Sequence, residues 1–147
     1  MNINLLPITS KNLFNVTLIE DHLFDVNERY DLETFKSILI DYPNNIFFIK
    51  LDNIVGILIS YVLDEYYYLD SIGILPEFRN KGMCKQLFND YLIPEAKRLS
   101  CDEIRLHVNK DNTAAIGLYM KLGFETIEVI ENYYGDNRNG YYMKKKI

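Results

Sequence analysis

A lone glycine between a strand-like segment and a helix-like segment constrains the fold of this chain more than any other feature. The stretch "YYYLDSIGILPEF" (66–78) is rich in aromatic and β-branched residues, and "GMCKQLFNDYL" (82–92) has helical periodicity. The first amides of a helix lack intrahelical partners, so such a join can bind an anion, and Gly82 lets a ligand approach closely. Arg79 and Lys81 add positive charge. Most joins of this kind are simple turns, so both interpretations stay open on these residues alone.

The hydrophobic pattern on either side of this join predicts one α/β domain over residues 1–147. We expect strands at residues 3–9, 45–50, 54–63, 66–75, 103–108, 124–134 and 140–146. We expect helices within 10–40, from about 82 onward with a kink or an early end at Pro94, and over 111–123. The order predicts a mixed, mostly antiparallel seven-stranded sheet with about four helices, in which the crossover 66–108 joins two parallel strands.

Length, charge and cysteine usage narrow the class of protein. The chain has 147 residues, which suits one domain, and a net charge of −5, which argues against a nucleic-acid partner. Its two cysteines, Cys84 and Cys101, form no C-x-x-C pair, so we expect reduced thiols and a cytoplasmic location. "IVGILISYVL" is about half of a membrane span, and the N-terminus lacks a secretory pattern, so we expect no membrane association.

Two sequence motifs resemble those of the GNAT acetyltransferases. "IGILPEFRNKGMCKQLF" resembles motif A, V-x-P-x-x-[QR]-x-x-G-x-[GA], through Ile74, Pro76, Arg79 and Gly82. "LHVNKDNTAAIGLYMKLGFE" resembles motif B, and the matching residues are Asn112, Ala115, Tyr119, Gly123 and Phe124. The resemblance extends over nearly the whole chain. It implies the GNAT fold, with central parallel strands splayed apart, and the activity of an acyltransferase.

The resemblance also implies acetyl-CoA as the co-substrate, without a metal. The implied cofactor-binding residues are Ile72, Gly73, Ile74, Arg79, Asn80, Lys81, Gly82, Met83, Cys84, Asn112 and Tyr119. In the family a bulge at the position of Gly73 separates two strands, and an interior glycine often marks a bulge. A packing role for Gly73 and a helix-capping role for Asn112 are the alternatives that the residues leave open.

A narrower resemblance is to the protein N-terminal acetyltransferases, and it is carried by "HLFDVNERYDLETFKSIL", "YLDSIG", "LHV", "LYMKLGFE" and "ENYY". It implies that Tyr68 and His107 act through water as the base and that Tyr119 protonates the leaving thiolate. The implied substrate-binding residues are Phe24, Val26, Tyr133 and Tyr134. Each has an ordinary alternative, which is a packed aromatic for the tyrosines and a surface or hydrogen-bonded histidine on the polar face of its strand for His107.

The resulting hypothesis is an acetyl-CoA-dependent N-acetyltransferase in which a primary amine attacks the thioester directly. A peptide or protein N-terminus is the favoured acceptor. This chain has Phe24-Asp25-Val26 where the subgroup has Phe-Pro-Val, and an acid near a cationic amine would equally suit a polyamine or an aminoglycoside-like molecule. A CoA-binding module without catalysis is a further alternative. We expect the protein to act as a monomer or a homodimer.

Overall fold

The computed structural model describes residues 1–147 and contains the predicted mixed sheet, with strand order β1-β2-β3-β4-β5-β7-β6. The strands are β1 (Asn4–Pro7), β2 (Ile46–Lys50), β3 (Ile54–Leu63), β4 (Tyr66–Ile74), β5 (Glu103–Asn109), β6 (Glu125–Ile130) and β7 (Gly140–Lys146). The helices are α1 (Leu13–Leu23), α2 (Leu32–Asp41), α3 (Met83–Leu87), α4 (Ile93–Arg98) and α5 (Thr113–Lys121). β4 and β5 pair in parallel, whereas β1–β2, β2–β3, β5–β7 and β6–β7 pair antiparallel.

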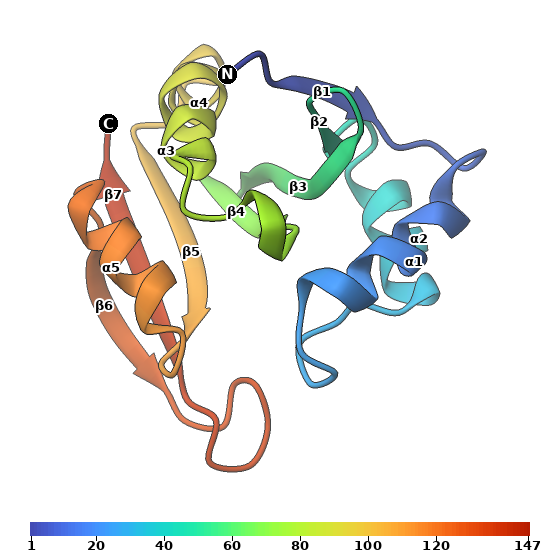
Figure 1. Cartoon of the computed structure of the whole chain (residues 1–147). Coiled ribbons are helices and arrows are strands. Elements are labelled where there is room, and N and C mark those ends of the chain that lie inside the picture. Colours follow the sequence, from blue (N-terminus) through green and yellow to red (C-terminus); the bar gives the residue numbers. More distant parts are fainter. The chain divides into compact units, whose positions relative to one another are not determined.

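The chain forms two compact units, and β4 contributes to both. The first unit comprises residues 1–61 and 71–83. It holds β1, β2, most of β3 and the end of β4, together with α1 and α2, which lie side by side (Figure 1). Its interior is built from fully buried apolar side chains, namely Ile8, Val16, Phe35, Ile46, Ile49, Ile57 and Ile59. Apart from Ile8, which follows β1, these residues come from both helices and strands, as expected for helices packed on a sheet.

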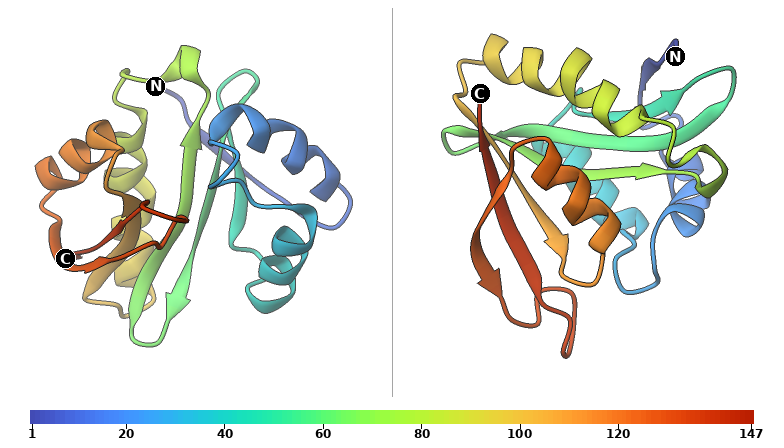
Figure 2. Two further views of the ribbon diagram at one scale, coloured as in Figure 1. Left: turned by 90° about the horizontal axis from the view of Figure 1, so that it is seen from below. Right: turned by 60° about the vertical axis from the view of Figure 1, so that its left-hand side comes forward.

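The second unit comprises residues 62–70 and 84–147. It holds the start of β4, the β5–β7–β6 sheet, the helical segment that ends at Arg98, and α5, which runs along this sheet (Figures 1 and 2). Its core side chains are Tyr67, Phe88, Leu92, Ala96, Ile104, Leu106 and Met143. The alternation predicted for β5 is confirmed, because Ile104, Leu106 and Val108 are all buried.

Pro94 does not end its helix, contrary to one of the two expected outcomes. A π-helical turn (Phe88–Leu92) links α3 to α4, so that one helical segment runs from Met83 to Arg98 (Figure 2). The N–H of Ile93 donates to the carbonyl of Phe88, five residues earlier, and Pro94 then occupies the first turn of α4. A proline is tolerated in a first turn because its missing N–H needs no partner there.

None of the helices is long and apolar enough to cross a membrane.

The expected strand over 124–134 is too long at its C-terminal end. β6 ends at Ile130, and the next residues form a turn in which Asn132 has φ +57°. The Asn132 Oδ1 accepts the backbone N–H of Asn137 at 2.8 Å. Asparagine tolerates the left-handed conformation and bonds locally to the backbone, so it breaks the strand that the apolar pattern would otherwise continue.

The end of β4 is closely packed, by backbone at Gly56 and by side chains at Gly73. A Cβ added to Gly56 would collide with the carbonyl oxygen of Gly73, and a Cβ added to Gly73 would lie 2.7 Å from the Cζ of Phe24. The parallel ladder itself is short, because it pairs only Tyr67–Leu69 with Ile104–Leu106 although the strands have nine and seven residues. Parallel strands that diverge can pair only over a short ladder, so this ladder agrees with the expected splayed strands.

We expect Gly56→Ala to destabilise the protein by about 1–3 kcal/mol, because the added methyl group meets backbone that cannot rotate away. Gly117→Ala is the matched control, since a Cβ on Gly117 meets nothing within 4 Å and lies in α5. Alanine should favour that helix by about 0.5–1 kcal/mol. Urea unfolding measures both changes, and a Gly56→Ala protein as stable as the parent would contradict the close approach.

Candidate active site

The loop between β4 and α3 has the backbone that its motif predicts. Asn80 has φ +61° and Gly82 has φ +79°, and both angles lie in the left-handed region. Glycine is favoured at position 82 by this conformation rather than by crowding, because a Cβ there meets nothing within 4 Å. The space beside Gly82 is therefore open to a ligand. Lys81 lies near the ring of Phe78, with 5.7 Å between its Nζ and the ring centroid.

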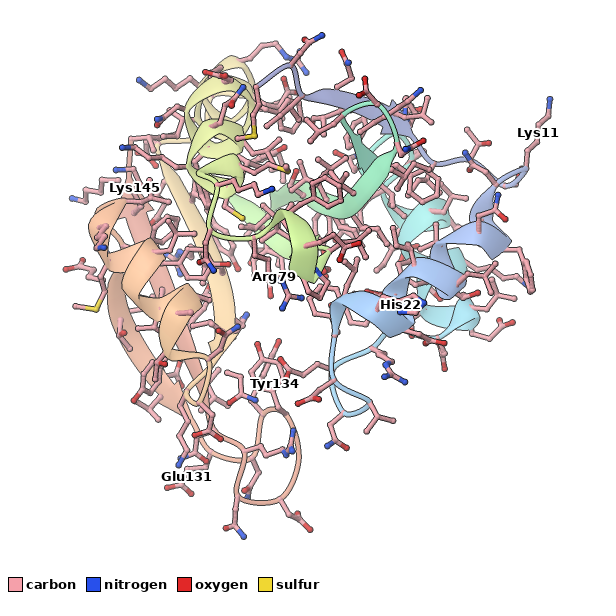
Figure 3. The ribbon with its side chains drawn as sticks, in the orientation of Figure 1. Lys11, His22, Arg79, Glu131, Tyr134 and Lys145 are labelled. Atoms are coloured by element: carbon pink, nitrogen blue, oxygen red, sulfur yellow. The ribbon has the colours of Figure 1, made fainter.

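Arg79 braces this loop through hydrogen bonds to backbone carbonyls. Its Nε donates to the carbonyl of Ile74 at 2.8 Å, and its Nη2 donates to the carbonyl of Leu23 at 3.3 Å. Figure 3 shows its side chain extending from the loop that follows β4. The guanidinium thus ties the loop to the end of β4 and to the C-terminal end of α1, in addition to placing a positive charge there.

The structure brings Phe24 to the end of β4 but places Val26 elsewhere in the first unit. The Phe24 ring packs on Gly73, beside the half-buried Ile72 and the buried Ile74. Val26 is 70% exposed. It lines a shallow cavity of about 360 Å³ whose other lining residues are Thr17, Leu18, Asp21, Arg29, Tyr30 and Asp31. Of the two residues predicted to border the first side-chain pocket, only Phe24 lies against the predicted acetyl-CoA strand.

His107 is the centre of an aromatic cluster in the second unit. The Tyr68 hydroxyl and the His107 Nδ1 are 2.6 Å apart, which is a direct hydrogen bond. The imidazole stacks with the ring of Tyr133 at 4.5 Å and 6° and with the ring of Tyr142 at 4.4 Å and 13°. Burial lowers the pKa of His107, so the neutral imidazole prevails at neutral pH and can accept a proton. The two stacked rings leave His107 half-buried rather than fully exposed.

Two residues that support this cluster were not expected from the sequence. Tyr142 lies directly opposite His107 in the β5–β7 ladder, and its hydroxyl accepts from the Nη1 of Arg105 at 3.2 Å. Arg105 also pairs with Glu103 at 3.0 Å and stacks on Tyr66 at 4.4 Å. Desolvation raises the pKa of Tyr66 to about 12. The alternation along β5 places Arg105 and His107 on one face, but the register that brings Tyr142 to them is not visible in the sequence.

Tyr119 is buried between aromatic rings of the helical layer. It is 8% exposed, and its ring centroid lies 6.1 Å from that of Phe88 and 5.7 Å from that of Phe124. Burial is the main cause that raises the pKa of Tyr119, and the neighbouring Cys84 thiol adds to it. The hydroxyl therefore stays protonated at neutral pH and can only donate a proton there.

The remaining predicted residues have local roles that the structure defines. The Asn112 Oδ1 accepts the N–H of Ala115 at 3.2 Å, so Asn112 caps α5. Tyr134 lies in the turn before β7 (Figure 3), and its ring meets that of Tyr133 edge-on at 4.8 Å. Met83 begins α3 and is buried.

A match to a family model assigns the family. The model of the acetyltransferase (GNAT) family matches residues 14–124. This stretch includes the loop between β4 and α3, the Tyr68–His107 pair and Tyr119. The chain belongs to the GNAT acetyltransferase family. Its seven-stranded mixed sheet is the fold of that family, as the sequence predicted.

Two individual proteins to which the chain is similar are N-terminal acetyltransferases by name. The chain is 34% identical over 77 residues to an N-alpha-acetyltransferase of Saccharolobus solfataricus, a match that covers 52% of this chain and 46% of that protein. It thus spans less than half of that relative's length. The structure of Arabidopsis thaliana Naa50 with the bisubstrate analogue CoA-Ac-MVNAL superposes with a TM-score of 0.82 at 28% identity and covers 100% of both chains.

The same fold also occurs in relatives that act on small molecules. The spermidine/spermine N-acetyltransferase SpeG of Vibrio cholerae superposes with a TM-score of 0.74 and covers 98% of this chain and 92% of its own. Its identity to this chain is 19%, so this likeness concerns the fold alone.

We expect His107 to titrate below the ordinary histidine value of about 6.5, because burial disfavours the imidazolium. A histidine with a lowered pKa in the folded state stabilises the protein fully above about pH 6.5, and this stability is lost as the pH falls toward the folded pKa. An NMR titration of the two histidine rings, with His22→Gln to assign them, measures the midpoint. His107 midpoints at or above 6.5 would contradict the burial argument.

Proposed function

We propose that this protein transfers the acetyl group of acetyl-CoA to a primary amine, and that the favoured acceptor is the N-terminus of a peptide or protein. The observation that carries the proposal is the direct hydrogen bond between Tyr68 and His107 inside an aromatic cluster. This pair occupies the positions that the N-terminal acetyltransferase resemblance predicts for the base. The end-to-end similarity to Naa50 supports the same subgroup.

Acetyl-CoA would supply an acyl group activated as a thioester. The residues that fit it are the left-handed Asn80 and Gly82, with open space beside the glycine, and Lys81, whose charge suits a diphosphate. Arg79 keeps this loop in place through the carbonyls it binds. We assign the pantetheine to the backbone of 72–74, and we assign further contacts to Met83, Cys84, Asn112 and Tyr119.

The attacking amine must lose its proton before it can react. An α-amino group has a pKa of about 7.7–8.0 and a lysine side chain about 10.4, so an N-terminus needs less help at neutral pH. His107 is neutral there because burial lowers its pKa, and Tyr68 holds its Nδ1. The pair can therefore receive the proton while the free amine attacks the thioester carbonyl. A backbone N–H near Ile74 would stabilise the oxyanion.

Tyr119 would give its proton to the thiolate that departs from the acetyl group. Its raised pKa keeps the hydroxyl protonated until the leaving sulfur needs the proton. Because its ring is fixed between Phe88 and Phe124, the hydroxyl has a defined direction. This donor needs no metal or covalent intermediate.

A peptide acceptor would contact Phe24 and Val26 with its first residue and Tyr133 and Tyr134 with its backbone. One observation favours a cationic small molecule instead, since Asp21 and Asp31 line the shallow cavity that contains Val26. Both carboxylates already have partners, because Asp21 pairs with Arg29 at 3.8 Å and Asp31 accepts the N–H of Thr34 at 2.8 Å. We therefore prefer the peptide.

We assign both units to one acetyltransferase domain over residues 1–147, because the family match runs through both of them. The two free thiols, Cys84 and Cys101, suit a reducing compartment such as the cytoplasm. We expect a monomer or a homodimer that needs neither nucleic acid nor a membrane.

We expect short peptides with a free N-terminus, Met-started ones first, to be acetylated with a higher kcat/KM than spermidine, free lysine or an aminoglycoside. Release of the CoA thiol, followed with each acceptor at the same acetyl-CoA concentration, measures the order. N-terminally blocked versions of the peptides are the control. A preference for spermidine would replace the peptide proposal, and no thiol release with any amine would contradict catalysis.

We expect Tyr119→Phe to lower kcat by about 10²–10⁴-fold, the usual contribution of a general acid, with acetyl-CoA affinity nearly unchanged. Phenylalanine keeps the ring contacts with Phe88 and Phe124, so the melting temperature should stay close to that of the parent. Steady-state kinetics and acetyl-CoA titration separate the two effects. Near-normal turnover in this variant would make Tyr119 a packing residue.

A further inference from the structure

The His107 imidazole stacks with two tyrosine rings that come from different segments. The ring of Tyr142, in β7, lies 4.4 Å from the imidazole between centroids, with 13° between the planes. The ring of Tyr133, in the turn before β7, lies at 4.5 Å and 6°. Parallel stacks of this kind restrict the rotation of the central ring, so its two neighbours set the plane of the imidazole.

The β5–β7 ladder places these two rings on opposite sides of the imidazole. Tyr133 lies against Gly140, since a Cβ on that glycine would be 3.0 Å from the Cβ of Tyr133. Gly140 pairs with the residue two positions beyond His107 along β5. Tyr142 lies directly opposite His107, and its hydroxyl accepts from the Nη1 of Arg105, two residues before His107, at 3.2 Å. The imidazole is therefore held between the two rings.

The guanidinium that binds Tyr142 is itself fixed by several contacts. The Arg105 Nη2 donates to the Oε1 of Glu103 at 3.0 Å, and the Arg105 Cζ lies 4.4 Å from the ring centroid of Tyr66. The same Cζ is 5.5 Å from the ring centroid of Tyr142. The bond to Glu103 is the first cause that raises the pKa of Arg105, so the guanidinium stays charged at any working pH. Arg105 therefore gives the Tyr142 ring a fixed anchor.

Only one nitrogen of the stacked imidazole is occupied. The Nδ1 is 2.6 Å from the Tyr68 hydroxyl. The Nε2 has no hydrogen-bond partner in the chain and is not a buried atom, so it faces solvent. Because two rings set the plane of His107 and Tyr68 holds one of its nitrogens, the other nitrogen has a defined direction.

We propose that Tyr142, anchored by Arg105, is a positioning residue for the candidate base, and that the ring orientation it sets makes the Nε2 of His107 the atom that takes the proton. The proposal rests on the proposed acetyl transfer and deepens it, because the resemblance gives no role to Tyr142 or Arg105. Tyr142 acts only through the imidazole that it orients.

The proton step balances within these groups. An N–H bond of the acceptor ammonium breaks and an N–H bond forms at the His107 Nε2, directly or through one solvent molecule. The neutral ring carries its proton on Nδ1 before the step, because Nε2 needs a free lone pair to accept, and this Nδ1–H donates to the Tyr68 oxygen. The products are a neutral amine and an imidazolium, which later releases one proton to solvent. The faces of the two stacked rings attract that cation.

Titratable side chains lie around the imidazole on each element packed against it, namely Tyr68 on β4, Arg105 on β5, Tyr142 on β7 and Tyr133 in the turn. Burial raises the pKa of Tyr133, and the Asp70 carboxylate adds to this effect, so Tyr133 keeps its proton. The charge of Arg105 is matched by Glu103. Burial lowers the pKa of His107, so the ring is neutral before the acceptor binds.

Tyr142→Leu tests the positioning, because leucine removes the stacked ring and keeps an apolar side chain. Tyr141→Leu is the matched control, since Tyr141 lies opposite the buried Val108, on the other face of the same ladder. We expect Tyr142→Leu to lower kcat by about 10²-fold, the cost of a misplaced catalytic group, while the KM values of peptide and acetyl-CoA change by less than about threefold. Tyr141→Leu should retain the parent kcat. The parent kcat in Tyr142→Leu, or an effect on KM alone, overturns the proposal.

Tyr142→Phe is the conservative variant, because it restores the ring and lacks only the bond from Arg105. We expect its kcat to recover to within about tenfold of the parent value, since the stack on His107 remains. Melting curves show whether each variant is folded at the assay temperature. A folded Tyr142→Phe protein as slow as Tyr142→Leu overturns the role assigned to the stacked ring.

The ¹⁵N spectrum of the free protein adds a readout that a merely structural role would not move, with His22→Gln to assign the signals. The neutral His107 of the parent should carry its proton on Nδ1, and in Tyr142→Leu the two tautomers should mix. The His107 midpoint in that variant should rise toward about 6.5, because the covering ring is lost. Tyr141→Leu should change neither property. A parent His107 with its proton on Nε2 overturns the assignment of Nε2 as the acceptor.

These spectra separate failure of the positioning from failure of the proposed function, because they need no acceptor. An unchanged His107 tautomer in Tyr142→Leu overturns the positioning whatever the enzyme acetylates. A parent protein that releases CoA thiol with no amine contradicts the function, even where the His107 spectra change as expected.

Discussion

The candidate chemistry of this protein depends on the register of one short parallel ladder. Only three residue pairs join β4 to β5, and Tyr68 lies opposite Arg105 in the middle of them. This register places the Tyr68 hydroxyl 2.6 Å from His107, two residues farther along β5. Because side chains alternate between the faces of a strand, a shift of one residue would turn Tyr68 to the other face and break the pair.

Burial favours the neutral form of two groups in the second unit that we assign to proton transfer, His107 and Tyr119. It lowers the pKa of His107 and raises the pKa of Tyr119, so both are neutral at neutral pH. Neutral groups can exchange protons without leaving a charge stranded in a low-dielectric interior. Tyrosines of the second unit thus supply both apolar surface and hydroxyl groups.

In the loop between β4 and α3, the side chain of Arg79 and the backbone of Asn80 and Gly82 have different roles. Arg79 uses its Nε and Nη2 to bind the carbonyls of Ile74 and Leu23, so the guanidinium fixes the shape of the loop. Asn80 and Gly82 take left-handed conformations within that fixed loop. The backbone beside Gly82 remains open. The motif position of Arg79 suggests a ligand contact, but its hydrogen bonds in the structure are to the protein backbone.

The order of strands and helices could be predicted from the sequence, because apolar periodicity reports directly which face of each element is buried. The prediction failed where local bonding overrode that pattern. Asn132 ends the chain's extended conformation after β6 through a left-handed turn. At Pro94 only the early end, one of two expected outcomes, is wrong, because the π-helical turn lets the helix continue to Arg98.

The sequence by itself determined the mixed α/β fold, the glycine loop after β4 and the identity of the candidate proton carriers Tyr68, His107 and Tyr119. These rest on patterns within single elements or on contiguous motifs. Tertiary structure decided the partners of His107, because Tyr133 and Tyr142 reach it only through the β5–β7 register and the turn that Gly140 permits. It also decided that Phe24 packs on Gly73 while Val26 does not, since contacts between distant segments depend on packing that no local pattern records.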